Sequence, residues 1–197
     1  MNCPSCAAQN AADARFCSNC GQPLSGTVEE RRVVTVLFAD LVGFTSLSEH
    51  RDPEAVKRVV DGAFERLVVD ITSFGGKVDK IVGDAILALF GAPVAHEDDA
   101  ERAVRAALRM QGTLAAYCAE AGIEIRMRVG VNTGEVLVGA LRAGGDYTAM
   151  GDVVNLASRL QTTADPGDVV VGHATHAATA GAIEYEDHGQ LTARGRE

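Results

Sequence analysis

The chain has 197 residues, of which 47% are hydrophobic, and its formal net charge is −9. This much apolar material can form one substantial core together with a small accessory module. The acidic balance argues against nucleic-acid binding through a large basic surface. The sequence contains neither a run of the ~20 apolar residues that crossing a bilayer requires nor a basic, then apolar leader. We therefore expect a cytoplasmic protein that binds neither nucleic acid nor a membrane.

Two Cys-x-x-Cys pairs lie in the first two dozen residues, Cys3 with Cys6 and Cys17 with Cys20. Together they can supply the four thiolates of a tetrahedral zinc site, and the segment resembles a zinc ribbon. The alternative is a pair of disulfides, which a cytoplasmic setting disfavours. We expect one structural Zn²⁺ here. Cys118 stands alone in a helical pattern and is interpreted as a small core residue.

The next informative block is a run of strand-forming residues, Val33 to Ala39, that ends on Asp40. A turn of small residues and a helical pattern follow, so the strand delivers Asp40 to a place where free backbone amides can hold phosphate. A second acid, Asp84, precedes the apolar strand Ala85–Phe90. Two acids beside a phosphate-binding turn indicate a two-metal nucleotide site. Taken singly, Asp40 could be a helix N-cap and Asp84 a turn residue.

The remaining elements follow from apolar periodicity and from turn residues. Strands and helices alternate in the order βαββαββ with smaller elements after them, which predicts an α+β sandwich with helices over a mainly antiparallel sheet. A helical pattern follows Thr45, and Pro53 fits either its first turn or the start of a second helix. An apolar helix face runs from Val56 to Ile71 and stops at Gly75-Gly76, and further helices are expected at 98–120, 152–163 and 174–180. The expected strands are 77–80, 85–90, 124–131, 135–141, 169–171 and 183–188, with turns at Gly83-Asp84 and at Asn132-Thr133-Gly134.

A third block, Tyr147 to Leu160, contains Asn155 and Arg159, which are four residues apart and share one helix face. With the blocks around Asp40 and Asp84, it resembles the class III nucleotidyl cyclase catalytic domain. The resemblance implies a ferredoxin-like βαββαβ-type cyclase or palm sandwich. We divide the chain into a zinc ribbon at 1–24, a linker at 25–30 and a cyclase domain at 31–197, whose C-terminal end we expect to be truncated.

The resemblance assigns the metal and phosphate ligands. Asp40 and Asp84 would bind two Mg²⁺ or Mn²⁺ ions, with the backbone carbonyl of Leu41 as a further ligand. The backbone amides after it would cradle phosphate, namely those of Gly43, Phe44 and Thr45. Basic residues near the C-terminus, Arg194 and Arg196, are candidates for a further triphosphate contact.

The resemblance also assigns catalytic and base-reading residues. Asn155 would orient the ribose, and Arg159 would stabilise charge on the transferring phosphate. Lys80 would donate to N1 of adenine, an acceptor, whereas N1 of guanine carries a proton. Thr148 stands where many members of the family have Asp, which resembles a Thr-bearing subclass that includes bicarbonate-responsive adenylyl cyclases.

The implied activity is conversion of ATP to cyclic AMP and pyrophosphate by a head-to-tail homodimer. One subunit would supply Asp40 and Asp84. The other subunit would supply Lys80, Thr148, Asn155 and Arg159. A guanylate or dual-specificity cyclase is the first alternative. A silent, nucleotide-binding regulatory module is the second, although such modules usually lose one of these residues. A polymerase-like nucleotidyl transferase would lack the Asn155/Arg159 helix.

Overall fold

The structure is a computed structural model that describes residues 1–3, 6–12, 14, 16–20, 30–43, 52–140, 147–187 and 189. The helical pattern expected directly after Thr45 and most of the linker expected at 25–30 lie outside these residues.

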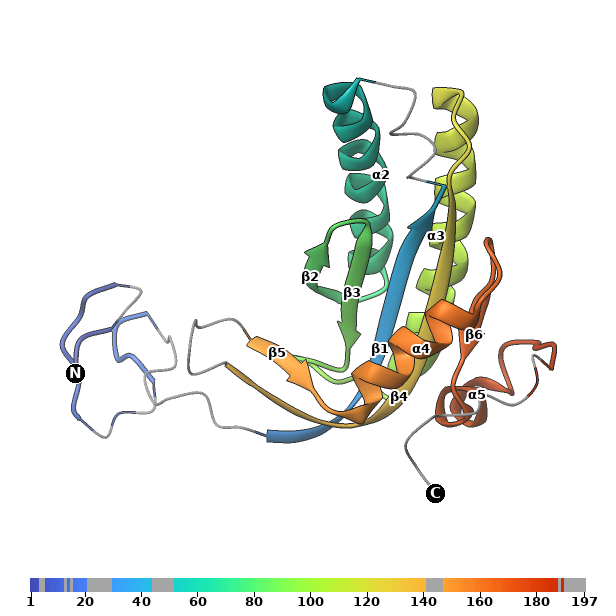
Figure 1. Cartoon of the computed structure of the whole chain (residues 1–197). Helices are drawn as coiled ribbons and strands as arrows, with labels where there is room; N and C mark the ends of the chain where they lie inside the picture. The colour runs from blue at the N-terminus through green and yellow to red at the C-terminus, as the bar shows by residue number, and fades with distance from the viewer. Residues whose placement is uncertain are drawn as a thin grey trace.

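Within the described residues, a six-stranded sheet forms the centre of the fold (Figure 1). Its strands follow the order β2-β3-β1-β4-β5, and β6 pairs with β4 in parallel, whereas the other pairings are antiparallel. The fold is therefore the mainly antiparallel α+β arrangement expected from the sequence. The strands are β1 (Glu30–Val42), β2 (Lys77–Val82), β3 (Ala85–Phe90), β4 (Arg126–Ala140), β5 (Tyr147–Met150) and β6 (Val169–Val171).

Helices cover both faces of this sheet. On one face, α2 (Pro53–Ser73) and α3 (Asp99–Ala121) lie side by side, while α4 (Asp152–Thr163) crosses the other face (Figure 1). The short α5 (His173–Thr179) follows β6. At the start of α2, the Asp52 carboxylate accepts a hydrogen bond from the backbone N–H of Glu54 at 2.8 Å, which is the usual N-cap contact.

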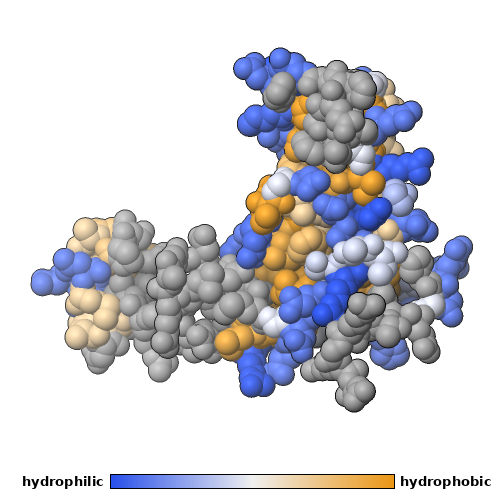
Figure 2. All heavy atoms as spheres, viewed as in Figure 1, coloured by the Kyte–Doolittle hydropathy of each residue, from blue (hydrophilic) through white to orange (hydrophobic). Residues whose placement is uncertain are grey.

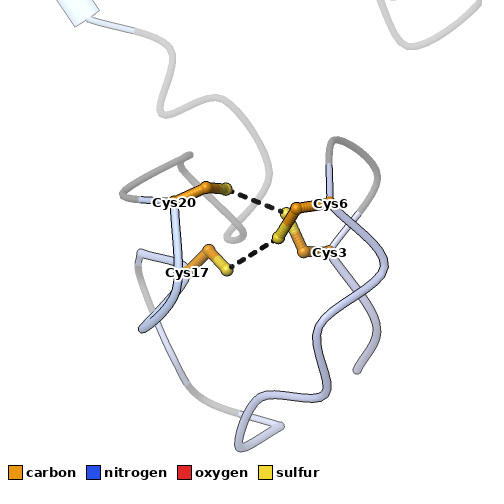
Figure 3. Close-up of side chains that lie close together, drawn as sticks. All are labelled: Cys3, Cys6, Cys17 and Cys20. Carbon is orange, nitrogen blue, oxygen red and sulfur yellow. Dashed lines mark hydrogen bonds between the residues drawn. The ribbon is translucent and has the colours of Figure 1, made fainter.

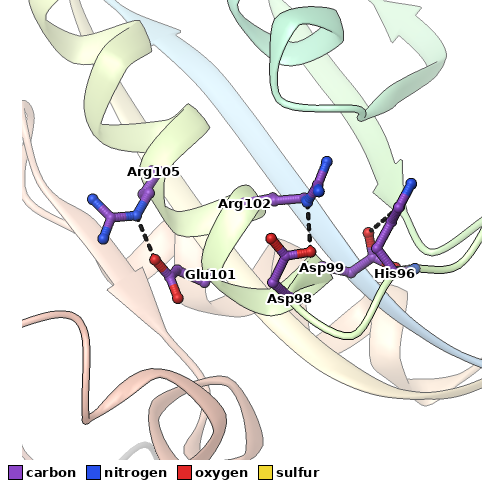
Figure 4. A network of polar contacts seen from close by, with 6 residues as sticks. All are labelled: His96, Asp98, Asp99, Glu101, Arg102 and Arg105. Atoms are coloured by element: carbon purple, nitrogen blue, oxygen red, sulfur yellow. Dashed lines mark hydrogen bonds and ion pairs between the residues drawn. The ribbon is translucent and has the colours of Figure 1, made fainter.

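The start of α3 is held by acidic side chains (Figure 4). The Asp99 carboxylate accepts from the backbone N–H of His96 at 2.7 Å and lies 3.2 Å from its Nδ1 atom. Asp98 and Glu101 each accept from an arginine four residues later at 2.6 Å, Arg102 and Arg105 respectively. His96 therefore belongs to a helix start, as its acidic neighbours in the sequence suggest.

The two faces of the sheet bury alternate residues of β1. Leu37, Ala39 and Leu41 join the large core beneath α2 and α3, which also contains Cys118 as expected. Val34 and Val36 pack instead in the smaller core under α4. Because side chains alternate along a strand, the Asp40 side chain belongs to the α4 face of the sheet.

One prediction about the sheet is wrong. The strands expected at 124–131 and 135–141 are the single strand β4, which runs through the residues taken for a turn. Asn132 is only 4% exposed, and its Nδ2 atom donates to the carbonyl of Val153 in α4 at 3.2 Å. A Cβ on Gly134 would lie 2.7 Å from a methyl group of Val153. These turn-forming residue types serve close packing of α4 on the strand.

The strand expected at 183–188 is also wrong over its described part. Residues 183–187 form no strand, and His188 lies outside the described residues. The hydroxyl of Tyr185 is 2.6 Å from that of Thr179, and its ring meets His176 edge-on at 4.9 Å. The segment is therefore held against α5 and not against a sheet edge. In addition, β5 is a strand that the sequence patterns did not reveal.

Candidate functional site

The end of β1 meets the turn between β2 and β3. Asp40 lies opposite Ala85 in the β1–β3 register, and the backbone N–H of Leu41 donates to the carbonyl of Asp84 at 3.1 Å. Gly83 and Asp84 form the two-residue hairpin turn expected from the sequence, and the positive φ of Gly83, 63°, suits such a turn. The fold thus brings together two acids that are 44 positions apart.

Burial and charge act together on Asp40. Its half-buried position raises the pKa of the carboxyl group, and the nearby negative charge of Asp84 raises it further. The positive charge of Arg128 and a hydrogen bond from Gln161 act in the opposite direction, but the net shift is upward. An ionised Asp40 is therefore incompletely compensated by the protein itself. A divalent cation would supply the missing positive charge, so the donor set of two carboxylates and the Leu41 carbonyl fits Mg²⁺ or Mn²⁺.

The turn that is expected to bind phosphate is described only at its start. Gly43 has a φ of 97°, and a Cβ at this position would lie 3.0 Å from the carbonyl oxygen of Glu124. Both constraints favour glycine, since its lack of a side chain allows the turn to approach that backbone closely. A pocket of about 540 Å³ opens beside Gly43 and Arg126. Phe44 and Thr45, the other two expected phosphate ligands, lie outside the described residues, as do Arg194 and Arg196.

The helix α4 has two distinct faces. Asn155 and Arg159 are exposed, whereas Ala157, Leu160 and Gln161 are buried against the sheet. The expected helix 152–163 is confirmed residue for residue, and Asp152 is the acid in its first turn. Asn155 and Arg159 therefore point away from the sheet that carries Asp40 in the same chain.

The two expected base-reading residues lie on different strands. Lys80 is in β2, with its side chain 47% exposed and its Nζ atom 3.4 Å from the almost fully buried carboxylate of Asp79. Thr148 is in β5, opposite Gly139 of β4. Its side chain is outside the described part of the structure.

Sequence reasoning missed two residues beside Asp40. Arg128 is directly opposite Asp40 in the β1–β4 register, and its Nε atom is buried without a hydrogen bond to any described residue. Arg128 belongs to an alternation of charged and apolar residues from Glu124 to Val129, and this pattern does not single it out. Gln161 is 5% exposed and donates from Nε2 to Oδ2 of Asp40 at 3.2 Å. Its position four residues after the buried Ala157 placed it on the inner helix face, but nothing in the sequence connected it to Asp40.

The four N-terminal cysteines converge, as Figure 3 shows. Their sulfur atoms all lie within 4.8 Å of one another, and the pairs Cys3–Cys20 and Cys6–Cys17 are each separated by 3.6 Å. A disulfide would need a separation of about 2.05 Å, whereas thiolates ~2.3 Å from a tetrahedral zinc ion lie roughly 3.8 Å apart. The cluster fits zinc and not the alternative of two disulfides.

The backbone around these sulfur atoms favours thiolates, the form that binds zinc. The backbone N–H of Cys20 is the main cause that lowers the pKa of Cys17, to about 6. The backbone N–H of Ala8 is the main cause that lowers the pKa of Cys6. In keeping with this chemistry, residues 2–24 match the zinc-ribbon domain family.

Residues 27–197 match the family described as the adenylate and guanylate cyclase catalytic domain. The chain belongs to this family. It is 35% identical over 179 residues to adenylate cyclase 1 of Rhizobium meliloti, an alignment that covers 87% of this chain and 27% of the relative. An adenylate cyclase of Anabaena cylindrica is 32% identical over 69% of this chain and 28% of its own length. The chain thus spans about a quarter of the length of these two relatives.

Solved cyclase structures share the fold. The adenylyl cyclase CyaB from P. aeruginosa has a TM-score of 0.82 at 30% identity, covering 86% of this chain and 91% of that one. The guanylyl cyclase Cya2 has a TM-score of 0.81 at 34% identity, covering 86% and 89% respectively. Relatives of both specificities are therefore similar to this cyclase domain. Among the described helices, none has the length and apolar character needed to cross a bilayer.

Proposed function

We propose that the chain is an adenylate cyclase that converts ATP to 3′,5′-cyclic AMP and pyrophosphate at a site shared by two subunits. The observation that carries this proposal is the meeting of Asp40 with the Asp84 turn, through the hydrogen bond from Leu41 to Asp84. In a chain of the cyclase family, two such acids are suited to holding divalent metal ions against a nucleoside triphosphate.

The residues of the chain divide the work of cyclisation. Bound metal ions would lower the pKa of the ribose 3′-hydroxyl and neutralise charge on the phosphates. Asp40 and Asp84 would fix these ions, and the backbone at Gly43 would bring amide donors close to phosphate. Arg159 would stabilise the charge that develops on the α-phosphate, and Asn155 would orient the ribose.

The choice of ATP rests on Lys80. Its ammonium group can only donate hydrogen bonds, which suits the N1 acceptor of adenine and not the N1–H of guanine. Thr148 can donate or accept through one hydroxyl, so it supports this preference without enforcing it. The similarity to the guanylyl cyclase Cya2 is the observation that supports the alternative of a guanylate or dual-specificity cyclase. Thr148 also leads us to propose membership of the Thr-bearing subclass, which includes bicarbonate-responsive adenylyl cyclases.

The two faces of α4 support the proposal of a head-to-tail homodimer. Asn155 and Arg159 are exposed, whereas the inner face of the same helix covers the sheet that carries Asp40. Exposed side chains of this kind are available to a second subunit. Ile81 and Val82, at the end of β2, are exposed apolar residues. Figure 2 shows hydrophobic surface in the region of the β2–β3 hairpin, and such surface suits a subunit interface. A symmetric pair would contain two equivalent sites.

The same proposal divides the chain into a zinc ribbon at 1–24, a linker at 25–30 and a catalytic domain from residue 31. The ribbon would hold one structural Zn²⁺ through four thiolates, and the need for reduced cysteines favours the cytoplasm.

Incubation of the purified protein with Mn²⁺ and equimolar ATP and GTP, followed by quantification of both cyclic products, tests the proposal. We expect cyclic AMP to predominate. An excess of cyclic GMP would support the guanylate alternative, and the absence of both cyclic products would support a silent module. Repeating the assay with sodium bicarbonate against sodium chloride tests the subclass.

A further inference from the structure

We propose that Gln161 is a positioning residue for the metal site: its side-chain amide holds the Asp40 carboxylate in the orientation that binds metal. The inference rests on the proposed function and goes beyond it, because Gln161 would act through Asp40 and not on the nucleotide. The supporting contact is the hydrogen bond from Gln161 Nε2 to Asp40 Oδ2 at 3.2 Å.

The contact lies at a closely packed helix–sheet junction. Gln161 is 5% exposed although its side chain is polar, and a buried amide of this kind needs hydrogen-bond partners. Beneath it, Gly130 of β4 leaves no room for a side chain, since a Cβ there would lie 2.2 Å from the Ala157 carbonyl and 2.4 Å from the Gln161 nitrogen. The backbone of α4 therefore rests on β4, and the position of Gln161 relative to Asp40 is fixed.

The hydrogen bond leaves Asp40 able to bind metal. An ionised carboxylate offers about four lone-pair sites, and Gln161 uses one of them on Oδ2. The amide N–H also donates to the ionised carboxylate of Asp40, which offsets part of the repulsion between the negative charges of Asp40 and Asp84. Partners that orient a metal ligand usually contribute about 10–100-fold to metal affinity or activity.

The location on α4 separates this role from a simple contribution to helix packing. In the proposed dimer, Gln161 serves the metal half of a site together with Asp40 of its own chain. Arg159, two residues earlier on the same helix, serves the other site. Loss of positioning would therefore damage the half that contains Asp40, whereas displacement of α4 would damage the half that contains Arg159.

The first test substitutes Gln161→Met, which keeps a similar length and removes the donor. Binding of Mn²⁺ is followed by the electron paramagnetic resonance of free Mn²⁺, in the presence of 3′-deoxy-ATP, which lacks the attacking hydroxyl. We expect binding to weaken about 10-fold or more. Gln111→Met is the matched control, because the Gln111 amide donates to the carbonyls of Met127 and Asp168 at 3.0 and 3.2 Å, away from Asp40. Equal affinity in the Gln161 variant and the wild type would overturn the proposal.

A second variant distinguishes the loss of the hydrogen bond from a disturbed fold. Gln161→Asn keeps the polar amide but shortens the side chain by one carbon, so the donor no longer reaches Asp40 while α4 stays in place. It should weaken Mn²⁺ binding as Gln161→Met does. If the Asn variant melts at the wild-type temperature and binds Mn²⁺ with wild-type affinity, Gln161 does not position Asp40.

The deciding test mixes Gln161→Met with a second variant under conditions in which subunits exchange. The Mn²⁺ concentration is set so that the activity of Gln161→Met alone is about 10-fold below that of the wild type. With Arg159→Ala as partner, activity should recover to roughly a quarter of wild type, since hybrids contain one intact site. With Asp40→Ala as partner, activity should stay below that of Gln161→Met alone. The reverse pattern would mean that Gln161 only holds α4 in place. A parallel mixture of Asp40→Ala with Arg159→Ala must recover cyclase activity. If it does not, the proposed dimer with shared sites is wrong, and the measured Mn²⁺ affinities alone decide whether Gln161 positions Asp40.

Discussion

The backbone N–H of Leu41 donates to the carbonyl of Asp84 at 3.1 Å. This hydrogen bond continues the β1–β3 pairing beyond Asp40 and into the hairpin turn, so the main chain itself fixes where the two acids stand. Neither carboxylate is needed for that arrangement. The side chains at positions 40 and 84 are therefore free to serve a function instead of the fold.

Replacing either acid should abolish turnover while leaving the fold intact. Asp40→Ala or Asp84→Ala removes a metal ligand, and a loss of several kcal/mol of transition-state stabilisation corresponds to about a 1,000-fold slower reaction. Cyclic AMP assays and thermal melts on both variants check this. Asp98→Ala, which removes an exposed acid paired with Arg102, is the control and should retain activity. Normal turnover in either site variant would contradict the metal assignment.

The charge environment of Asp40 leads to a stability prediction for the metal-free protein. Burial and the Asp84 charge raise the pKa of Asp40, so its ionised form is unfavourable in the fold. Asp40→Asn should therefore melt at or above the wild-type temperature without metal. Added Mn²⁺ should raise the melting temperature of the wild type more than that of the variant. A variant that melts well below the wild type would show that Asp40 supports the fold.

Lys80→Glu should lower the use of ATP relative to GTP, because a carboxylate accepts from the N1–H and N2–H₂ groups of guanine. The ratio of kcat/KM for the two nucleotides measures this change. Complete conversion is not expected, as Thr148 must also accommodate the 6-oxo group. Lys77→Glu, three residues earlier in β2, changes the net charge equally and should leave the ratio unchanged. The same ratio in the wild type and Lys80→Glu would exclude Lys80 as the residue that reads the base.

Removing zinc should disorder residues 3–20 without unfolding the catalytic domain. Cys3→Ser combined with Cys20→Ser removes two of four thiolates and should abolish zinc binding, measured as metal per chain by elemental analysis. Cys118→Ala is the control, because that thiol is buried in the core and should not alter the zinc content. Unfolding of the catalytic domain on mild chelation would mean that the two modules depend on each other.

Much of the fold could be predicted because its local signals agree with the tertiary structure. The apolar face of α4 predicts the helix at its observed bounds, and Gly83-Asp84 predicts the hairpin turn. The continuous strand β4 could not be predicted, because Asn132 and Gly134 are turn-forming types. Their role is to let α4 approach the strand, which is a tertiary contact that no local pattern reveals.

The candidate site divides in the same way. Asp40 and Asp84 could be found because each lies in a long recognisable block, and the structure then brings them together. Gln161 could not be found, because its partner is 121 positions away and only the packing of α4 on β4 creates the contact. Arg128 follows a local alternation of charged and apolar residues, which does not reveal its place opposite Asp40.

The packing of α4 on β4 can be tested through two glycines. Gly130→Ala would place a Cβ 2.2 Å from the Ala157 carbonyl, so we expect a loss of about 3 kcal/mol in the free energy of unfolding. Gly112→Ala, in the interior of α3 with no atom within 4 Å of the new Cβ, should instead stabilise by ~0.5–1 kcal/mol. Denaturant unfolding of the two variants measures both values. Equal stabilities would show that α4 does not rest on β4 at this glycine.

Subunit mixing tests the shared two-metal site most directly. Asp40→Ala removes the metal half of both sites in its homodimer, and Arg159→Ala removes the other half, so each homodimer should be nearly inactive. In an equal, exchanging mixture, half of the dimers are hybrids, and each hybrid contains one site with both defects and one with neither. Cyclic AMP production should therefore recover to roughly a quarter of the wild-type rate. No recovery, despite subunit exchange confirmed by differently tagged chains, would contradict a site built from two subunits.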